Sequence, residues 1–159
     1  MTQNDKDLKE LLLKDLCARL PYGVKCKMGN YDYIICDISL ERQYDVFYNS
    51  RRDFRIGVIG TEDNGNTFYT SVYEKHVKPY LFPISSMTEE QREEFLNIQT
   101  EERQILLNAL IEYKSGKYDK IPIIAPYKQI EWLNKNHFDY RGLIEKGLAI
   151  DATNLEIYK

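Results

Sequence analysis

The sequence predicts an α+β fold: an N-terminal helix, a β-rich region and a helical C-terminal region. The first observation is that the hydrophobic period changes from near four residues before Pro21 to two residues after Val24. The second is a series of short alternating segments separated by turn residues. The third is the stretch 78–89, where two prolines precede an acidic segment with helical spacing. We therefore expect about five short antiparallel strands in a curved sheet or small SH3-like barrel, followed by helices.

Length and composition favour one domain. A chain of 159 residues, 43% of them hydrophobic and 30% charged, can bury roughly 70% of its unfolded surface in one core. We expect a single domain over residues 1–159, in which residues 84–159 are mostly helical and pack on a helix and β-rich part at residues 1–83. No segment approaches the roughly 18 apolar residues of a membrane helix, and charges interrupt the first twenty residues. We expect no membrane association and a cytoplasmic location.

The chemistry-bearing residue types form no familiar motif. The three cysteines, Cys17, Cys26 and Cys36, lack the paired spacing of zinc or redox sites, so we expect reduced thiols packed in the core. Gly-rich phosphate loops, nucleophile elbows and paired-histidine metal motifs are absent from the sequence. We therefore predict no catalytic residue, no metal and no cofactor.

The N-terminal segment has the pattern of an amphipathic helix. Leucines recur every four residues, and charged side chains occupy the other side. The leucines are Leu8, Leu12, Leu16 and Leu20. We expect this helix to end at Pro21.

The first two strands are predicted from alternation. Apolar residues at Val24, Cys26 and Met28 alternate with two lysines, and a second strand is expected over about residues 32–40. A three-residue loop at 29–31 would place Cys26 beside Ile34 in the core and leave both lysines outside, whereas an even loop would put apolar and charged residues on one face. We therefore predict the three-residue loop.

Three further strands are expected, at about residues 44–48, 54–60 and 67–73. Asp63-Asn64-Gly65-Asn66 is a strong hairpin signal before the last of them, because Asn and Gly tolerate positive φ. Pro79 and Pro83 are expected to end any strand, since proline lacks a backbone donor.

Helices are expected after Pro83. Ser86 or Thr88 is a candidate N-cap, with Glu89 or Gln91 completing a capping box. Segments at 88–98 and 100–115 are helical in pattern and are compatible with one helix or two, and residues 121–126 are expected to be an extended connector. A short helix should begin near residue 126 and bury Trp132. Asp139 should cap a last helix over 140–146, with a final short strand near 148–150.

Three word-like blocks carry a resemblance. They are LCARLPYGV at 16–24, KPYLFPISSMT at 78–88 and EWLNKNHFDYRGLIEKGLA at 131–149. With these blocks the chain resembles a family of uncharacterised small proteins from gut Bacteroidales and their phages. The resemblance implies a phage or mobile-element origin, and it brings no known activity and no functional residues.

The richest chemical cluster is His137 to Arg141, near Trp132. The interpretation we favour is structural, because Asp139 fits an N-cap and Arg141 could pair with Glu145 four residues later. A binding role for Trp132, His137, Tyr140 and Arg141 is the alternative, and a small-ligand binder or enzyme centred on His137 is a further one.

A local basic patch gives the nucleic-acid alternative. Arg51, Arg52 and Arg55, with Lys25 and Lys27 on the same sheet, could contact phosphates. The formal net charge of −3 disfavours this role, because phosphate contacts normally supply most of the affinity.

The composition favours a protein partner most. One helical segment is strongly acidic, and the chain holds 13 tyrosines, a residue that suits both half-buried strands and protein interfaces. The acidic residues are Glu89, Glu90, Glu93, Glu94, Glu101 and Glu102. We expect a non-enzymatic protein-binding module that uses the acidic helix or the tyrosine-rich sheet, and the sequence leaves its oligomeric state open.

Overall fold

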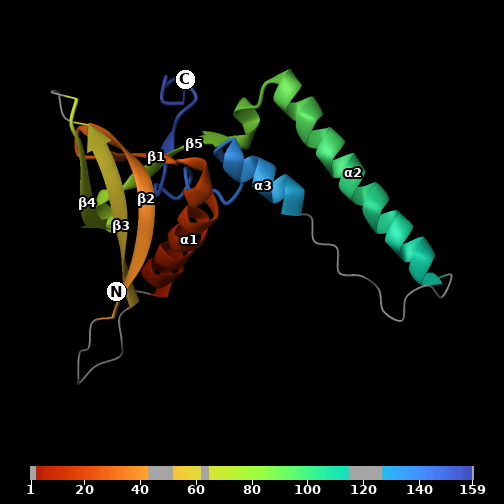
Figure 1. Ribbon diagram of the computed structural model, residues 1–159, viewed down its shortest axis with the longest axis horizontal. Coiled ribbons are helices and arrows are strands. Elements are labelled where there is room, and N and C mark those ends of the chain that lie inside the picture. The colour runs from red at the N-terminus through yellow and green to blue at the C-terminus, as the bar shows by residue number, and fades with distance from the viewer. Residues whose placement is uncertain (1–2, 43–51, 62–64, 115–126, 159) are drawn as a thin grey trace.

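The computed structural model describes residues 3–42, 52–61, 65–114 and 127–158. Helix α1 (Gln3–Arg19) lies against one face of a sheet (Figure 1) and passes into a 3-10 turn, η1 (Leu20–Tyr22), which contains Pro21. Leu12 and Leu16 of α1 are buried against the sheet, which confirms the predicted amphipathic helix. The turn ends at Gly23, whose φ of 65° suits glycine.

The sheet is mixed and open. Its strands are β1 (Lys25–Met28), β2 (Tyr31–Arg42), β3 (Arg52–Thr61), β4 (Thr67–Tyr73), β5 (Lys78–Pro83), β6 (Phe138–Asp139) and β7 (Ile150–Asp151). Their order is β4-β3-β2-β1-β5-β6, with β7 also beside β5. The pairs from β4 to β5 are antiparallel, whereas β6 and β7 run parallel to β5. The α+β class is confirmed, and the barrel alternative is wrong because the sheet does not close.

Strand β5 contradicts the expectation that the prolines end any strand. It lies between β1 and the short parallel strands, with 3-10 turns η2 (Glu74–His76) and η3 (Ile84–Ser86) on either side of it in the chain. Pro79 stands opposite Cys26, and Pro83 opposite Asp139. Each proline occupies the end of a two-residue ladder, where one missing donor disturbs little.

The register between β1 and β2 differs from the prediction. Met28 stands directly opposite Tyr31 across a two-residue loop, so Cys26 faces Tyr33 and Lys25 faces Ile34. The three-residue loop is therefore wrong. The reason is that the sequence has two adjacent isoleucines, and the second is the one buried in the core. Ile35 is 1% exposed, whereas Ile34 is 44% exposed.

An irregularity in β2 explains why simple alternation failed. The pairing with β3 shifts between Ile35 and Asp37, so that Ile35 stands opposite Val58 and Ile38 opposite Ile56. An extra residue at this point puts Ile35 and Ile38 on the same, core-facing side despite their odd spacing. An even loop therefore buries no lysine, because Ile34 lies on the outer face with Lys25.

This register makes a direct prediction for two neighbouring residues. Ile35→Ala should lower the free energy of unfolding by about 2–3 kcal/mol, because it leaves a cavity beneath the sheet. Ile34→Ala should cost under about 1 kcal/mol, since that side chain is largely outside the core. Urea denaturation of the two variants measures the difference. A larger loss for Ile34→Ala would contradict the register.

The later strands agree with the sequence where they are described. Strand β3 covers the predicted 54–60 segment, β4 matches 67–73, and their antiparallel pairing confirms the predicted hairpin. The expected strand at 44–48 and the connector at 121–126 lie outside the described residues.

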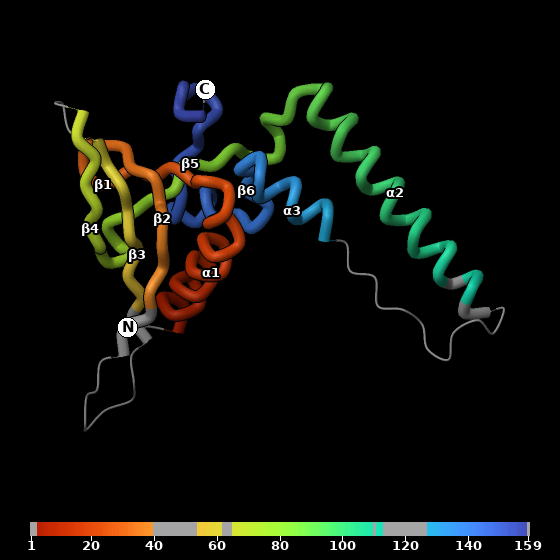
Figure 2. Tube along the Cα trace, viewed as in Figure 1, coloured from red at the N-terminus to blue at the C-terminus, as the bar shows by residue number. Residues whose placement is uncertain are grey.

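Helix α2 (Glu89–Lys114) is one continuous helix rather than two. Its N-terminus carries the expected capping box: the Gln91 N–H donates to Thr88 Oγ1 at 3.2 Å, and the Thr88 N–H donates to Gln91 Oε1 at 3.0 Å. Helix α3 (Tyr127–Lys135) follows, as predicted. The tube in Figure 2 shows α2 leading away from the body of the molecule, with α3 returning toward α1.

Two further expectations are corrected. Residues 140–148 form turns rather than a helix, and Asp139 belongs to β6, although the final strand near residue 150 is present. Among the cysteines, Cys26 is buried, but Cys17 is exposed and Cys36 is half-buried. Cys17 lies beside the buried face of α1 rather than on it.

Candidate functional site

The residues of the predicted cluster near His137 contact a buried ion pair of α1. Asp15 and Arg19 are both fully buried, and the Arg19 guanidinium donates to both Asp15 oxygens, at 2.7 and 3.0 Å. Arg19 also donates to the Phe138 carbonyl at 2.7 Å. Arg141 approaches the same carboxylate at 3.3 Å as an ion pair, in place of the expected Glu145, and its guanidinium and that of Arg19 both lie near the Tyr140 ring. These groups join α1 to the C-terminal region.

His137 is a packed residue at the end of α3. It adopts a φ of 58°, in the left-handed region common after helix ends, and its ring stacks on Tyr158 with centroids 4.0 Å apart. Burial, followed by the Arg19 and Lys25 charges, lowers the pKa of His137 to about 4. Its Nδ1 has no hydrogen-bond partner among the described residues. A neutral imidazole stacked on a tyrosine is poorly placed for acid–base chemistry.

The lowered pKa makes stability depend on pH. The unfolded chain protonates this histidine near pH 6.5, whereas the folded chain keeps it neutral down to about pH 4. The free energy of unfolding should therefore fall as the pH drops from 6.5 to 4, and this loss should be complete below pH 4. Removing the imidazole with His137→Asn, which tolerates the backbone conformation, should flatten that part of the profile. Unchanged steepness in urea titrations across this range would show that His137 titrates normally.

Asp139 caps a turn instead of a helix. Its two carboxylate oxygens accept hydrogen bonds from the Leu143 and Ile144 N–H groups, at 2.9 and 2.8 Å. Asp139 therefore has the predicted capping role, but the N–H groups that it caps belong to a turn and not to a helix. Asp139→Ala should cost roughly 0.5–2 kcal/mol, which a thermal melt can measure. A melt that matches the wild type would mean that these two bonds contribute nothing.

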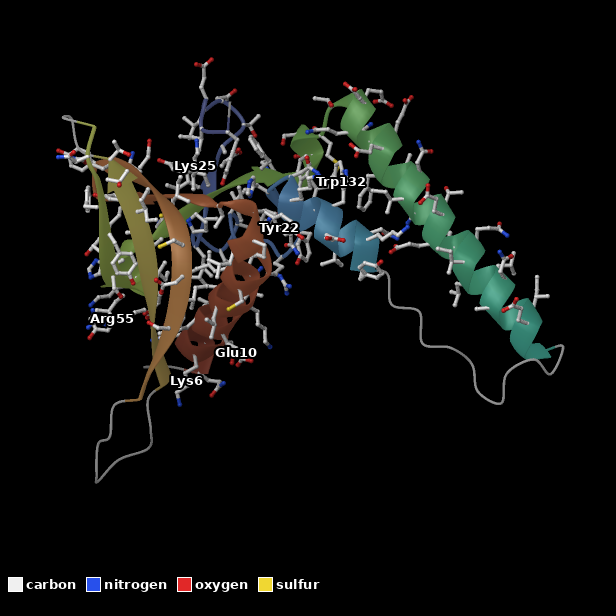
Figure 3. All side chains as sticks on the ribbon, in the orientation of Figure 1. Lys6, Glu10, Tyr22, Lys25, Arg55 and Trp132 are labelled. Atoms are coloured by element: carbon white, nitrogen blue, oxygen red, sulfur yellow. The ribbon has the colours of Figure 1, made fainter. Side chains whose placement is uncertain are left out.

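Trp132 is buried, as predicted, at 6% exposure. Its ring stacks on Phe138 with centroids 5.6 Å apart and contacts Phe95 of α2 at 5.5 Å. Figure 3 shows Trp132 on the side of α3 toward α2. Trp132, His137, Tyr140 and Arg141 are therefore brought together as parts of the packing between elements.

The basic residues do not form one surface in the described part of the chain. The Arg55 guanidinium lies 4.1 Å from the Tyr73 ring centroid and donates to its hydroxyl at 2.9 Å. Lys25 donates to the Ile157 carbonyl, so it turns toward the C-terminal residues. Arg51 and the side chain of Arg52 lie outside the described residues. Figure 3 shows Arg55 and Lys25 at separate places on the sheet.

The outer face of the sheet carries a short apolar row. Ile34, Ile59 and Tyr69 follow one another across three strands and are 44%, 39% and 58% exposed. The Tyr69 hydroxyl donates to Asp37 Oδ2 at 2.8 Å. That bond passes over Gly57, where an added Cβ would lie 2.2 Å from the same oxygen. Among the other tyrosines of the β-rich region, Tyr31 is also exposed, Tyr33 and Tyr73 are half-buried, and Tyr44 and Tyr48 lie outside the described residues.

Among the described residues, the contacts of α2 with α3 and Trp132 lie along its first half. Phe95 and Ile98 pack near Trp132, and the buried Glu102 accepts hydrogen bonds at 2.8 Å from the Lys128 N–H and from Gln129 Nε2. Figure 1 shows the C-terminal half of α2 continuing away from α3 and from the sheet. Large apolar residues there are exposed: Ile105 46%, Leu106 40%, Leu107 51% and Ile111 58%.

The sequence pointed only partly to this surface. The helical pattern over 100–115 includes an apolar stripe with Leu106, Leu107 and Ile111, but that pattern does not mark Ile105 or Leu96 as exposed. The sequence does indicate an exposed apolar surface here, because the apolar residues at 105, 106, 107 and 111 lie around the helix instead of along one side.

Other features offer little chemistry. A depression of about 280 Å³ lies between α1, η2 and Leu148, with an apolar floor that includes Leu8 and Val77. Nowhere in the described ranges do His, Cys, Asp and Glu side chains gather in a group of three that could hold a metal ion. The described helices include none that is long and apolar enough to cross a membrane.

Comparisons with protein-family models, with curated proteins and with solved structures find no match for this chain.

Proposed function

We propose that this chain is a non-enzymatic protein-binding module whose contact surface is the distal half of α2, residues 103–114, here called the α2 arm. The observation that carries the proposal is the exposure of four large apolar side chains, Ile105, Leu106, Leu107 and Ile111, within seven positions. A helix that is apolar on several sides is normally buried by other protein surfaces and not left exposed to water. The α2 arm therefore fits a partner that covers more than one side of it, as a deep groove does.

The charge of α2 indicates the chemistry of that partner. Acidic residues dominate its first two turns, with Glu89, Glu90, Glu93 and Glu94 against Arg92. Glu89 and Glu93 share a face with Leu96, Leu107 and Ile111, because these positions are separated by whole helical turns. A partner with an apolar groove that has basic side chains at one end would match both features.

The resemblance to proteins of gut Bacteroidales and their phages belongs to the same proposal. It implies that the partner is a protein of a bacterial host cell that carries these phages or related mobile elements. Two observations weigh against the rival functions: Arg55 is held by Tyr73, and the His137 ring is buried against Tyr158.

The test is comparative purification from host cells with quantitative mass spectrometry. Leu107→Glu combined with Ile111→Glu should remove the partner from the purified material, and Gln104→Glu combined with Asn108→Glu should retain it. The control pair lies on the same arm and replaces exposed polar residues, which hydrogen-bond each other. The same proteins recovered at the same levels with both pairs would contradict the proposal.

A further inference from the structure

We propose that two copies of this chain pair through strand β4 and form one continuous sheet. The inference concerns the edge of the sheet and does not depend on the proposed role of the α2 arm. Figure 1 shows β4 and α2 at opposite ends of the molecule, so the two surfaces can be occupied at the same time.

Strand β4 is an open edge. In the described part of the chain its ladder partner is β3 alone, so alternate residues direct their N–H and C=O groups away from the sheet. The one described polar contact to its backbone from elsewhere is a long one, 3.5 Å from Arg55 to the Ser71 carbonyl. Unpaired edge groups of this kind are a template for another strand.

The edge strands of natural sheets usually carry charges, prolines or bulges that prevent pairing with another strand, and β4 has none of these. Its sequence, TFYTSVY, has no charged residue and no proline. Its register with β3 runs from Thr67 to Tyr73 without a shift, so no bulge turns the edge away. Phe68 and Tyr69 are also 37% and 58% exposed on this strand. A β-prone, uncharged and regular edge is suited to pairing with a strand.

The sequence of β4 is complementary to itself in the antiparallel direction. With a two-fold axis at Thr70, Phe68 would face Val72 of the second copy, and Tyr69 would face Ser71. At the ends, Thr67 would face Tyr73. Aromatic side chains thus meet β-branched or small ones on each face, and Thr70 meets its own copy, which are favourable cross-strand pairs. Self-complementarity is what a two-fold interface requires, and it makes a second copy the occupant that fits best.

Sedimentation velocity of the full chain over a range of concentrations tests the association. The wild type should shift from monomer to dimer as the concentration rises. Tyr69→Lys combined with Ser71→Lys places like charges opposite each other twice across the axis, so it should raise the dimer dissociation constant at least about tenfold. Far-UV circular dichroism checks that the variant is folded. A wild type that stays monomeric throughout would overturn the proposal.

The register has its own test, with conservative substitutions that keep the fold. In a background with Cys17→Ser and Cys36→Ser, Thr70→Cys should form an intermolecular disulfide under mild oxidation, because facing residues of an antiparallel pair have Cα atoms about 4.5–5.5 Å apart. Thr67→Cys, which lies six residues from its own copy, should remain uncrosslinked. Equal crosslinking of both, or none of Thr70→Cys, would overturn the proposal.

The α2 variant Leu107→Glu combined with Ile111→Glu separates this inference from the proposed function. It should dimerise as the wild type does while losing its partner. Loss of the dimer in that variant would place self-association on α2 and overturn the β4 interface.

Discussion

Asp15→Ala should lower the free energy of unfolding by about 3–5 kcal/mol, the expected cost of leaving a buried charge without its partner. In the wild type, both Asp15 and Arg19 have no exposed side-chain surface. Without the carboxylate, the Arg19 guanidinium keeps its bonds to main-chain carbonyls but loses its counter-charge, and Arg141 loses its ion pair as well. Denaturant titration at neutral pH measures the loss.

The same helix supplies the matched control. Glu10 and Lys14 form a second pair four residues apart, at 2.8 Å, but their side chains are 64% and 62% exposed. Glu10 lies near the middle of α1 (Gln3–Arg19), about two turns before Arg19. Glu10→Ala should leave the unfolding midpoint essentially unchanged, because water replaces the partner. Similar losses for the two variants would mean that the Asp15 pair is not buried in solution.

Trp132→Ala should also cost about 3–5 kcal/mol. The ring lies between Phe138 and Phe95, so its removal leaves a cavity where α3, β6 and α2 meet. Helix α2 should lose its docking to α3 together with this contact. Hydrogen exchange in residues 89–102 should accelerate along with the fall in the free energy of unfolding.

Trp132→Phe distinguishes packing from hydrogen bonding. The Trp132 Nε1 group has no hydrogen-bond partner among the described residues, so the phenyl ring loses only contact area. Its cost should stay under about 1.5 kcal/mol. A Phe variant as unstable as the Ala variant would point to a role for the indole N–H.

The sequence predicted the elements whose pattern is local and strong. Leucines spaced by four in α1 and the Thr88 and Gln91 capping box needed no knowledge of distant residues. The hairpin before β4 likewise followed from the turn residues between two alternating segments. These features depend on neighbours within a few positions, where propensity and periodicity are informative.

The failures depend on residues that are distant in sequence. Alternation could not choose between Ile34 and Ile35, because the shift in β2 is fixed by its pairing with β3. Strand β5 tolerates its prolines because each ends a two-residue ladder, Pro79 opposite Cys26 of β1 and Pro83 opposite Asp139 of β6, and both partner strands are distant in sequence. The expected helix at 140–146 gives way to turns, held partly by the Asp139 carboxylate.

The candidate site was predicted only in outline. Composition predicts an acidic helix, but which part of that helix is exposed depends on where α3 begins against Glu102. Likewise, Arg141 was expected to pair with its neighbour Glu145, and it lies instead beside Asp15 of α1. Pairing across more than a hundred residues leaves no local pattern to read.

Site-specific photo-crosslinking in host cells tests the central claim most directly. A photoreactive residue at Ile111 of the α2 arm should yield a discrete heavier adduct containing another protein, and the same residue at the exposed Lys14 of α1 should not. The absence of an adduct at Ile111, or equal adducts at both positions, would contradict the assignment of the α2 arm as the binding surface.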